Sequence, residues 1–270
     1  MGFMENQTDL NDLLAEAEAA DLGVLVDYIT DNGAGRFSLK DDVCARLSRC
    51  RHNDKYSKSD RKLIATEIRL FGGNTLVNLF RGEGIPYRDL LEDVASHLKV
   101  QFRKHDAIAA IELGVLQTIF SQAWDKMTED ERTNVLDHLH MGHATGTGPA
   151  ATAAALLGIR ASGFAAYRLS AVVANSVAST LIGRGIPLAA NAAMARTFGA
   201  LLGPIGWVVT GLWSLADLAS PAYRVTVPCV IQIAYIRQKA LSHFCPSCQA
   251  PNGTDAKYCG QCGAPMMPKE

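Results

Sequence analysis

Acidic residues are missing from a long internal stretch of this 270-residue chain, which has no Asp or Glu between Asp137 and Asp217. Besides mostly small and apolar residues, the stretch holds four fixed cations: Arg160, Arg168, Arg184 and Arg196. A surface helix of a soluble protein keeps a charged face toward water, and this stretch has few residues to form one. We therefore expect the rest of the chain to cover it, or the stretch to contact a membrane or an apolar partner.

Motifs of common enzyme classes are missing as well. The sequence has no phosphate-binding Walker loop, no GxSxG nucleophile elbow and no HExxH zinc-protease motif. Its N-terminal stretch is polar and acidic, without the basic and apolar segments of a secretory signal. These absences predict a non-enzymatic, cytoplasmic protein, with the inner face of the membrane as a candidate place of contact.

The net charge of −1 conceals an asymmetry between the two halves of the chain. Residues 1–137 carry 24 acids and 17 bases, whereas residues 138–270 carry 3 acids and 9 bases. Such an imbalance indicates that the two halves attract each other, or that the second half meets an anionic surface.

Residues 1–141 are predicted to form an acidic, all-α domain. Apolar residues recur there at helical spacing, and no alternating strand pattern of useful length occurs. The pattern predicts successive helices that end near Arg51, Phe71, Val100, Met127 and Leu139. Ser38 with Asp41, and Thr128 with Glu131, have the spacing of a helix capping box.

Residues 142–240 are predicted to form a second, helical region that is apolar and rich in Gly and Ala. Its uncharged run 197–216 approaches the roughly 20 residues that cross a bilayer. Glycine and proline interrupt this run at Gly203, Pro204, Gly206 and Gly211. Trp207 and Trp213 lie in its second half, where aromatic side chains are placed to contact a membrane interface.

The four arginines of this region are 8, 16 and 12 residues apart, all multiples of four, so helices would hold them in stripes. One interpretation is a helix lying in a lipid headgroup layer. The other is a helical hairpin packed through its small residues, with the arginines reaching the acidic domain. Both interpretations stay open. We take Arg160, Arg168, Arg184, Arg196, Trp207 and Trp213 as candidate contacts for a membrane or a client.

Two charged features carry weaker signals. Asp217 lies in apolar surroundings, where an unpaired carboxylate is expensive to bury. We expect a structural ion pair with Arg224, with Arg237 as a second candidate partner and a solvated helix end as the alternative.

Seven bases lie close together within residues 46–62. They could contact phosphate, but the interspersed acids favour a solvated helix face.

Residues 244–264 are predicted to form a small zinc ribbon. Two CxxC pairs, Cys245 with Cys248 and Cys259 with Cys262, offer four thiolates at the spacing of a double zinc knuckle. Four protein ligands close the coordination sphere, so the predicted Zn²⁺ is structural. Lys257 is the one cation between Cys245 and Cys262, which disfavours nucleic acid and favours a protein partner for the ribbon.

Several motifs resemble the bacterial YaaW family, which is grouped by sequence with ubiquinol–cytochrome c chaperones. They are FGG at 71–73, WDKM at 124–127 and, most distinctively, GPIGW at 203–207 followed by SPAYRVTVPCVIQIAYIR at 220–237. The resemblance covers roughly residues 8–239. It implies a helical protein without a recognised active site, and it does not extend to the cysteine tail.

Two functions follow from these observations. The first is a non-enzymatic protein that associates conditionally with an anionic membrane through its Gly/Ala-rich segment, with the ribbon as a docking or regulatory module. The second is a soluble, chaperone-like assembly factor that binds apolar client helices. A zinc-dependent nucleic-acid regulator is disfavoured by the low charge of the ribbon, and a homo-oligomer stays an option.

Overall fold

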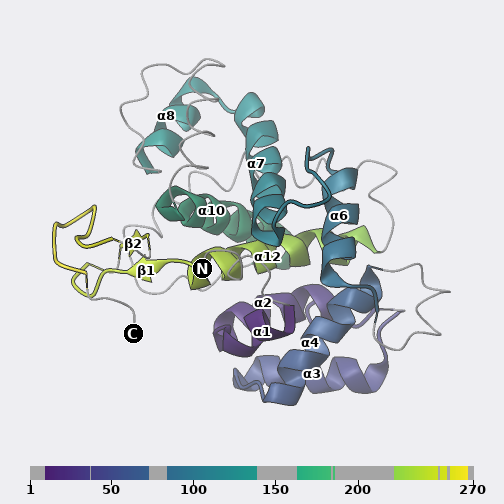
Figure 1. The fold of residues 1–270 in the computed structure, drawn as a ribbon. Helices are drawn as coiled ribbons and strands as arrows, with labels where there is room; N and C mark the ends of the chain where they lie inside the picture. Colours follow the sequence, from purple (N-terminus) through teal and green to yellow (C-terminus); the bar gives the residue numbers. More distant parts are fainter. Residues whose placement is uncertain are drawn as a thin grey trace.

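A computed structural model describes residues 10–36, 38–72, 84–138, 163–183, 185, 222–248, 250–253 and 256–266. Within these ranges the chain forms nine helices and one two-stranded sheet (Figure 1). The protein is therefore mostly helical, as predicted, and the small sheet belongs to the cysteine-rich C-terminal segment.

The acidic first part of the chain contributes seven of these helices. They are α1 (Leu10–Glu16), α2 (Ala19–Thr30), α3 (Asp41–Asn53), α4 (Lys58–Phe71), α6 (Tyr87–His97), α7 (Ile108–Lys126) and α8 (Glu129–His138). The apolar second part contributes α10 (Gly163–Ile182) and α12 (Tyr223–Ala240).

Helix starts follow local capping chemistry, though one predicted cap is wrong. At α8 the backbone N–H of Thr128 donates to Glu131 at 2.8 Å and the N–H of Glu131 donates back to Thr128 at 3.3 Å, which confirms that capping box. Helix α3 instead begins after Lys40, which makes no side-chain cap, so the predicted box at Ser38 is wrong. Helix α4 has a complete box, formed by Ser57 and Asp60.

Helix α12 is the centre of the fold. It contacts α2 and α4 on one side and α6, α7 and α10 on the other (Figure 1). Every residue from Val225 to Gln238 is buried. The sequence accounts for this position because 225–236 carries no charge, and a helix that is apolar all round is stable only inside a core.

One apolar core joins both parts of the chain. It includes Leu14 of α1, Val115 of α7, Val173 of α10 and Ile233 of α12, all 0% exposed. The predicted boundary between the two helical regions lies within 139–162, outside the described residues, and stays a prediction. Within the described ranges, no helix combines the length and apolar character that crossing a bilayer requires.

Candidate metal centre

The cysteine tail folds into two matching knuckles beside a short hairpin. Strand β1 (His243–Phe244) leads directly into Cys245 and pairs antiparallel with β2 (Pro251–Asn252). In the first knuckle the N–H of Cys245 donates to the carbonyl of Ala250 at 2.9 Å. The second repeats this bond between Cys259 and Ala264 at 2.7 Å. The similar sequences CPSCQA and CGQCGA are thus each closed by the same bond, from the first cysteine to the last alanine.

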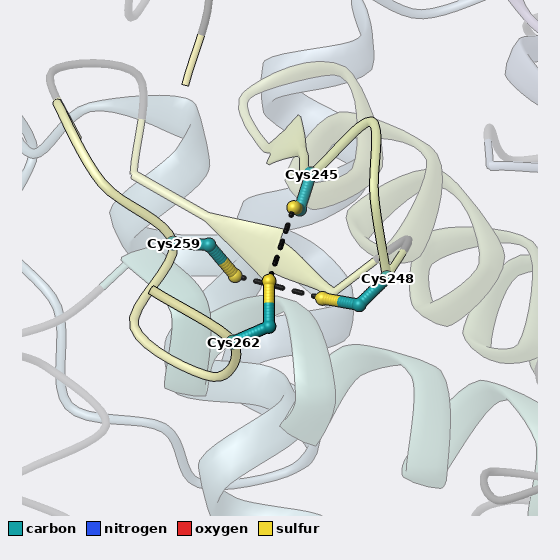
Figure 2. Close-up of side chains that lie close together, drawn as sticks. All are labelled: Cys245, Cys248, Cys259 and Cys262. Atoms are coloured by element: carbon teal, nitrogen blue, oxygen red, sulfur yellow. Dashed lines mark hydrogen bonds between the residues drawn. The ribbon is translucent and has the colours of Figure 1, made fainter. Parts of the chain in front are cut away.

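The four sulfur atoms converge on one point (Figure 2). All four Sγ atoms lie within 4.8 Å of one another. The Sγ–Sγ distance is 3.7 Å between Cys245 and Cys262 and 3.6 Å between Cys248 and Cys259. Tetrahedral zinc with Zn–S bonds of about 2.3 Å separates its sulfur ligands by about 3.8 Å. The residues therefore fit one Zn²⁺, which would cross-link the two knuckles.

Backbone N–H groups in each knuckle favour the thiolate that a metal needs. The N–H groups of Cys248 and Ser247 lower the pKa of Cys245. Burial opposes ionisation of Cys259, but the N–H groups of Cys262 and Gln261 outweigh it and lower the pKa of that thiol to about 6.

Cys248 differs from these two thiols. The N–H of Ala250 favours its thiolate, but burial and the thiols of Cys262 and Cys259 together raise its pKa to about 12. A divalent cation among the four sulfurs would favour the thiolate of Cys248 and so oppose this rise in its pKa.

Asn252 supports the site from behind the sulfurs. Its Nδ2 donates to the Ala250 carbonyl at 2.8 Å and lies 3.6 Å from Sγ of Cys259, while its Oδ1 accepts from the N–H of Gly260 at 2.9 Å. A side chain that holds a ligand in place in this way tunes metal affinity. The CxxC spacing gave no signal for Asn252, because its role depends on the pairing of β1 with β2.

A second polar cluster lies inside the helical core, away from the cysteines. Arg237 of α12 donates to Glu112 of α7, with Nε 2.7 Å from Oε2 and NH2 3.2 Å from Oε1, and the Tyr87 hydroxyl donates to Oε1 at 2.8 Å. The three residues are 3%, 0% and 4% exposed. Burial raises the pKa of Glu112 despite the opposing effect of Arg237. Because all three residues are buried, we interpret the cluster as structural.

The end of α12 is tied to the first helices by another ion pair. Lys239 Nζ lies 2.8 Å from Glu18 and 2.9 Å from Asp21. Burial raises the pKa of Asp21 despite Lys239. The Gln232 amide donates to the backbone carbonyl of Asp21 at 3.3 Å. The sequence analysis did not identify these partners, since each pair joins residues more than 200 positions apart.

Few of the predicted membrane or client contacts fall within the described residues. Arg168 of α10 is 8% exposed, and its NH2 donates to Gln261 of the ribbon at 3.4 Å. Burial lowers the pKa of Arg168 to about 10. The other predicted contacts lie outside the described residues: Arg160, Arg184, Arg196, Trp207 and Trp213. Their role stays a prediction.

The predicted ion pair of Asp217 with Arg224 is likewise untested, because Asp217 lies outside the described residues. Arg224 is exposed in the first turn of α12. Arg237, the second candidate partner, pairs with Glu112.

Bases of the cluster at 46–62 find partners within the protein. Arg46 pairs with Asp60 at 2.7 Å and Arg51 with Asp27 at 3.1 Å. Arg61 donates two bonds of 2.7 Å to backbone carbonyls at the end of α1. These contacts give the three arginines a role in packing α1 to α4 together.

Comparison with known proteins places the chain in a family. It is 34% identical over 229 residues to a UPF0174 protein of Helicobacter pylori strain J99, an alignment that covers 84% of this chain and 90% of the relative. The chain belongs to the UPF0174 family. It is also 28% identical over 246 residues to the UPF0174 protein YaaW of Escherichia coli K12, covering 86% of this chain and 94% of that protein.

Two family models match this UPF0174 chain. The model described as ubiquinol–cytochrome C chaperone matches residues 59–231, and the zinc-ribbon domain model matches residues 244–266. These matches confirm the resemblance carried by the motifs at 71–73, 124–127 and 203–237. No solved structure matches.

Proposed function

We propose that this UPF0174 protein is a non-enzymatic, cytoplasmic protein that associates conditionally with anionic membranes through its Gly/Ala-rich segment. The observation that carries the proposal is the stretch from His138 to Ala216, which has no acid and four arginines. Cations at the border of apolar surface gain both from apolar burial and from attraction to anionic headgroups.

The association would be conditional because α10, the described part of this segment, lies inside the protein. Val173, Ala174 and Val177 are 0% exposed and belong to the common core. Helix α10 packs against α7 and α12. Membrane contact through α10 would therefore need this packing to open.

Flotation of the purified protein with vesicles tests the proposal. Vesicles of anionic and of zwitterionic lipid are compared at about 0.1 M and about 1 M salt, where the Debye length falls from about 10 Å to about 3 Å. We expect flotation with anionic vesicles at low salt and release at high salt. Protein that stays at the bottom in every condition would contradict membrane association of the resting protein.

A matched pair of variants assigns the contact. Replacing Arg160, Arg184 and Arg196 with Gln removes three charges from the apolar segment and should abolish salt-sensitive flotation. Replacing the exposed Arg49, Lys55 and Lys58 with Gln removes the same charge from the basic cluster at 46–62 and should leave flotation unchanged. Equal loss in both variants would mean that net charge, and not this segment, governs binding.

The second candidate function is a chaperone-like assembly factor. The match of the ubiquinol–cytochrome C chaperone model to residues 59–231 favours it. In this function the apolar segment would bind the helices of a client protein in aqueous solution and would not bind lipid. Binding of apolar helical peptides without any flotation would support this function over the first.

A further inference from the structure

The ribbon is packed onto the apolar region and does not hang free from the end of α12. Phe244 of β1 meets the ring of Tyr167 edge-on, with 5.4 Å between ring centroids and 87° between planes. Tyr167 also packs against Tyr235 of α12, at 6.0 Å. Strand β2 contacts α10 (Figure 1). A row of aromatic contacts therefore joins the ribbon, α10 and the central helix α12.

A polar contact links the same helix to the metal site itself. Gln261 lies between Cys259 and Cys262 in the second knuckle. Its backbone N–H donates to Sγ of Cys259 at 3.4 Å, and its side-chain Oε1 accepts from Arg168 of α10 at 3.4 Å. The sulfur of Cys259 thus helps to fix the backbone of Gln261, and the side chain of Gln261 contacts α10.

The contact surface of the ribbon is held in shape by very little apolar packing. Its own core has four buried residues, Cys245, Ala250, Cys259 and Met266, and two of these are metal ligands. A core of this size does not fold by itself, so metal binding supplies the folding free energy of such a unit. Asn252 connects Cys259 to β2, so the strand that contacts α10 is fixed to a ligand.

We infer that the ribbon is a zinc-dependent clasp on helix α10. With the four cysteines bound to Zn²⁺, Phe244 and Gln261 hold α10 against α12. Without the metal the knuckles lose their shape, both contacts go, and α10 opens more readily. Helix α10, which belongs to the apolar region, is then released from α12.

The coupling between zinc and α10 stands on these contacts alone. Its regulatory meaning rests on the proposed function, because release of α10 would expose apolar surface to a membrane or a client. Loss of zinc would then strengthen an association that the zinc-loaded protein already makes.

Hydrogen–deuterium exchange on the full-length protein tests the clasp. The zinc-loaded protein is compared with protein treated with a zinc chelator, and exchange is followed in peptides from 163–182. Peptides from α3 (41–53), which packs on α2 and α4, serve as the internal control. We expect exchange in α10 to become several-fold faster without zinc while α3 is unchanged. Unchanged α10, together with free exchange in 243–266, would overturn the inference.

Two variants separate the clasp from general damage. Phe244→Ala and Gln261→Ala leave all four ligands in place, so each should keep its zinc while α10 exchanges faster, whatever the zinc content. Tyr258→Ala removes an aromatic side chain of the ribbon that is 68% exposed and should behave like the parent protein. Variants that retain zinc and keep α10 as protected as in the parent would refute the role of these contacts.

The clasp and the proposed function fail in distinguishable ways. If chelation speeds exchange in α10 but does not increase flotation with anionic vesicles, the clasp holds and the membrane function of the released helix is wrong. If the protein floats while α10 exchange ignores zinc, the membrane function holds and the clasp is wrong.

Discussion

Replacing Arg237 with methionine should destabilise the protein strongly, because it leaves the carboxylate of Glu112 buried without its ion-pair partner. Glu112 is 0% exposed and accepts two hydrogen bonds from Arg237, at 2.7 and 3.2 Å. Two unit charges about 4 Å apart attract by about 4 kcal/mol at an effective dielectric constant of 20. Breaking a buried pair by removing one partner typically costs about 3–5 kcal/mol. We expect a loss in this range.

Urea unfolding followed by circular dichroism measures this loss. With a slope of about 2–3 kcal/mol per M, the midpoint should fall by about 1–2.5 M. The control is the triple variant Glu112→Leu, Arg237→Met and Tyr87→Phe, which removes the whole polar cluster and should recover most of the stability. A single variant that loses less than about 1 kcal/mol, or a triple variant no more stable than the single one, would refute this account of the cluster.

The pH dependence gives the sign of the effect. Burial already raises the pKa of Glu112 above its ordinary value of 4.5, and losing Arg237 removes the interaction that opposes this rise. A carboxyl group whose folded pKa is raised contributes stability at low pH that is lost as pH rises through the folded pKa. The deficit of Arg237→Met should therefore shrink as the pH falls from 7 toward 4.5. A deficit that does not vary with pH would contradict a buried, titrating Glu112.

Three further predictions concern local features. Asp60→Asn should cost about 1–2 kcal/mol in urea unfolding, because Asp60 caps α4 and binds Arg46. Ser57 and Arg46 outweigh burial and lower the pKa of Asp60 to about 2. In the parent protein the stability that Asp60 contributes is therefore present above pH 3.8 and is lost as the pH falls toward 2. A variant that loses stability between pH 3.8 and 2 in the same way as the parent would contradict this. Gly84→Ala should lower the melting temperature through a cost of about 1–3 kcal/mol, since Gly84 has φ +71° and a Cβ would lie 2.5 Å from the carbonyl carbon of Arg69; an unchanged melting temperature would refute the close approach. Cys262→Ser should abolish the single equivalent of bound zinc in metal analysis, and retained zinc would contradict the four-cysteine site.

Much of the fold could be predicted from local sequence patterns. The CxxC spacing predicted the ribbon because two such turns supply the four ligands of a tetrahedral metal, and the structure brings the four sulfurs together. The uncharged run 225–236 marked a helix that had to be buried, and α12 lies at the centre of the core. Helix ends followed glycine breaks and caps, as at Thr128, with an error at Ser38, where no side-chain cap forms.

Long-range polar partners could not be predicted in the same way. With 27 acids and 26 lysines and arginines, the sequence does not say which carboxylate meets which cation. Glu112 follows directly after the apolar Ile111 in α7, and only the packing of α12 against α7 supplies Arg237. Local spacing likewise did not indicate that the ribbon contacts α10, where Gln261 lies beside Arg168. Such contacts depend on tertiary arrangement, which local spacing does not encode.

Tryptophan quenching by brominated lipids tests most directly whether the Gly/Ala-rich segment contacts the membrane. In a Trp124→Phe variant the remaining tryptophans, Trp207 and Trp213, both lie in that segment. Trp124 is 1% exposed in α7, so a Trp207→Phe, Trp213→Phe variant provides a reporter from the core. We predict that anionic brominated vesicles quench the first variant at low salt and leave the second unchanged. Equal emission of the first variant with and without bromine, in protein that floats with the vesicles, would contradict membrane contact through this segment.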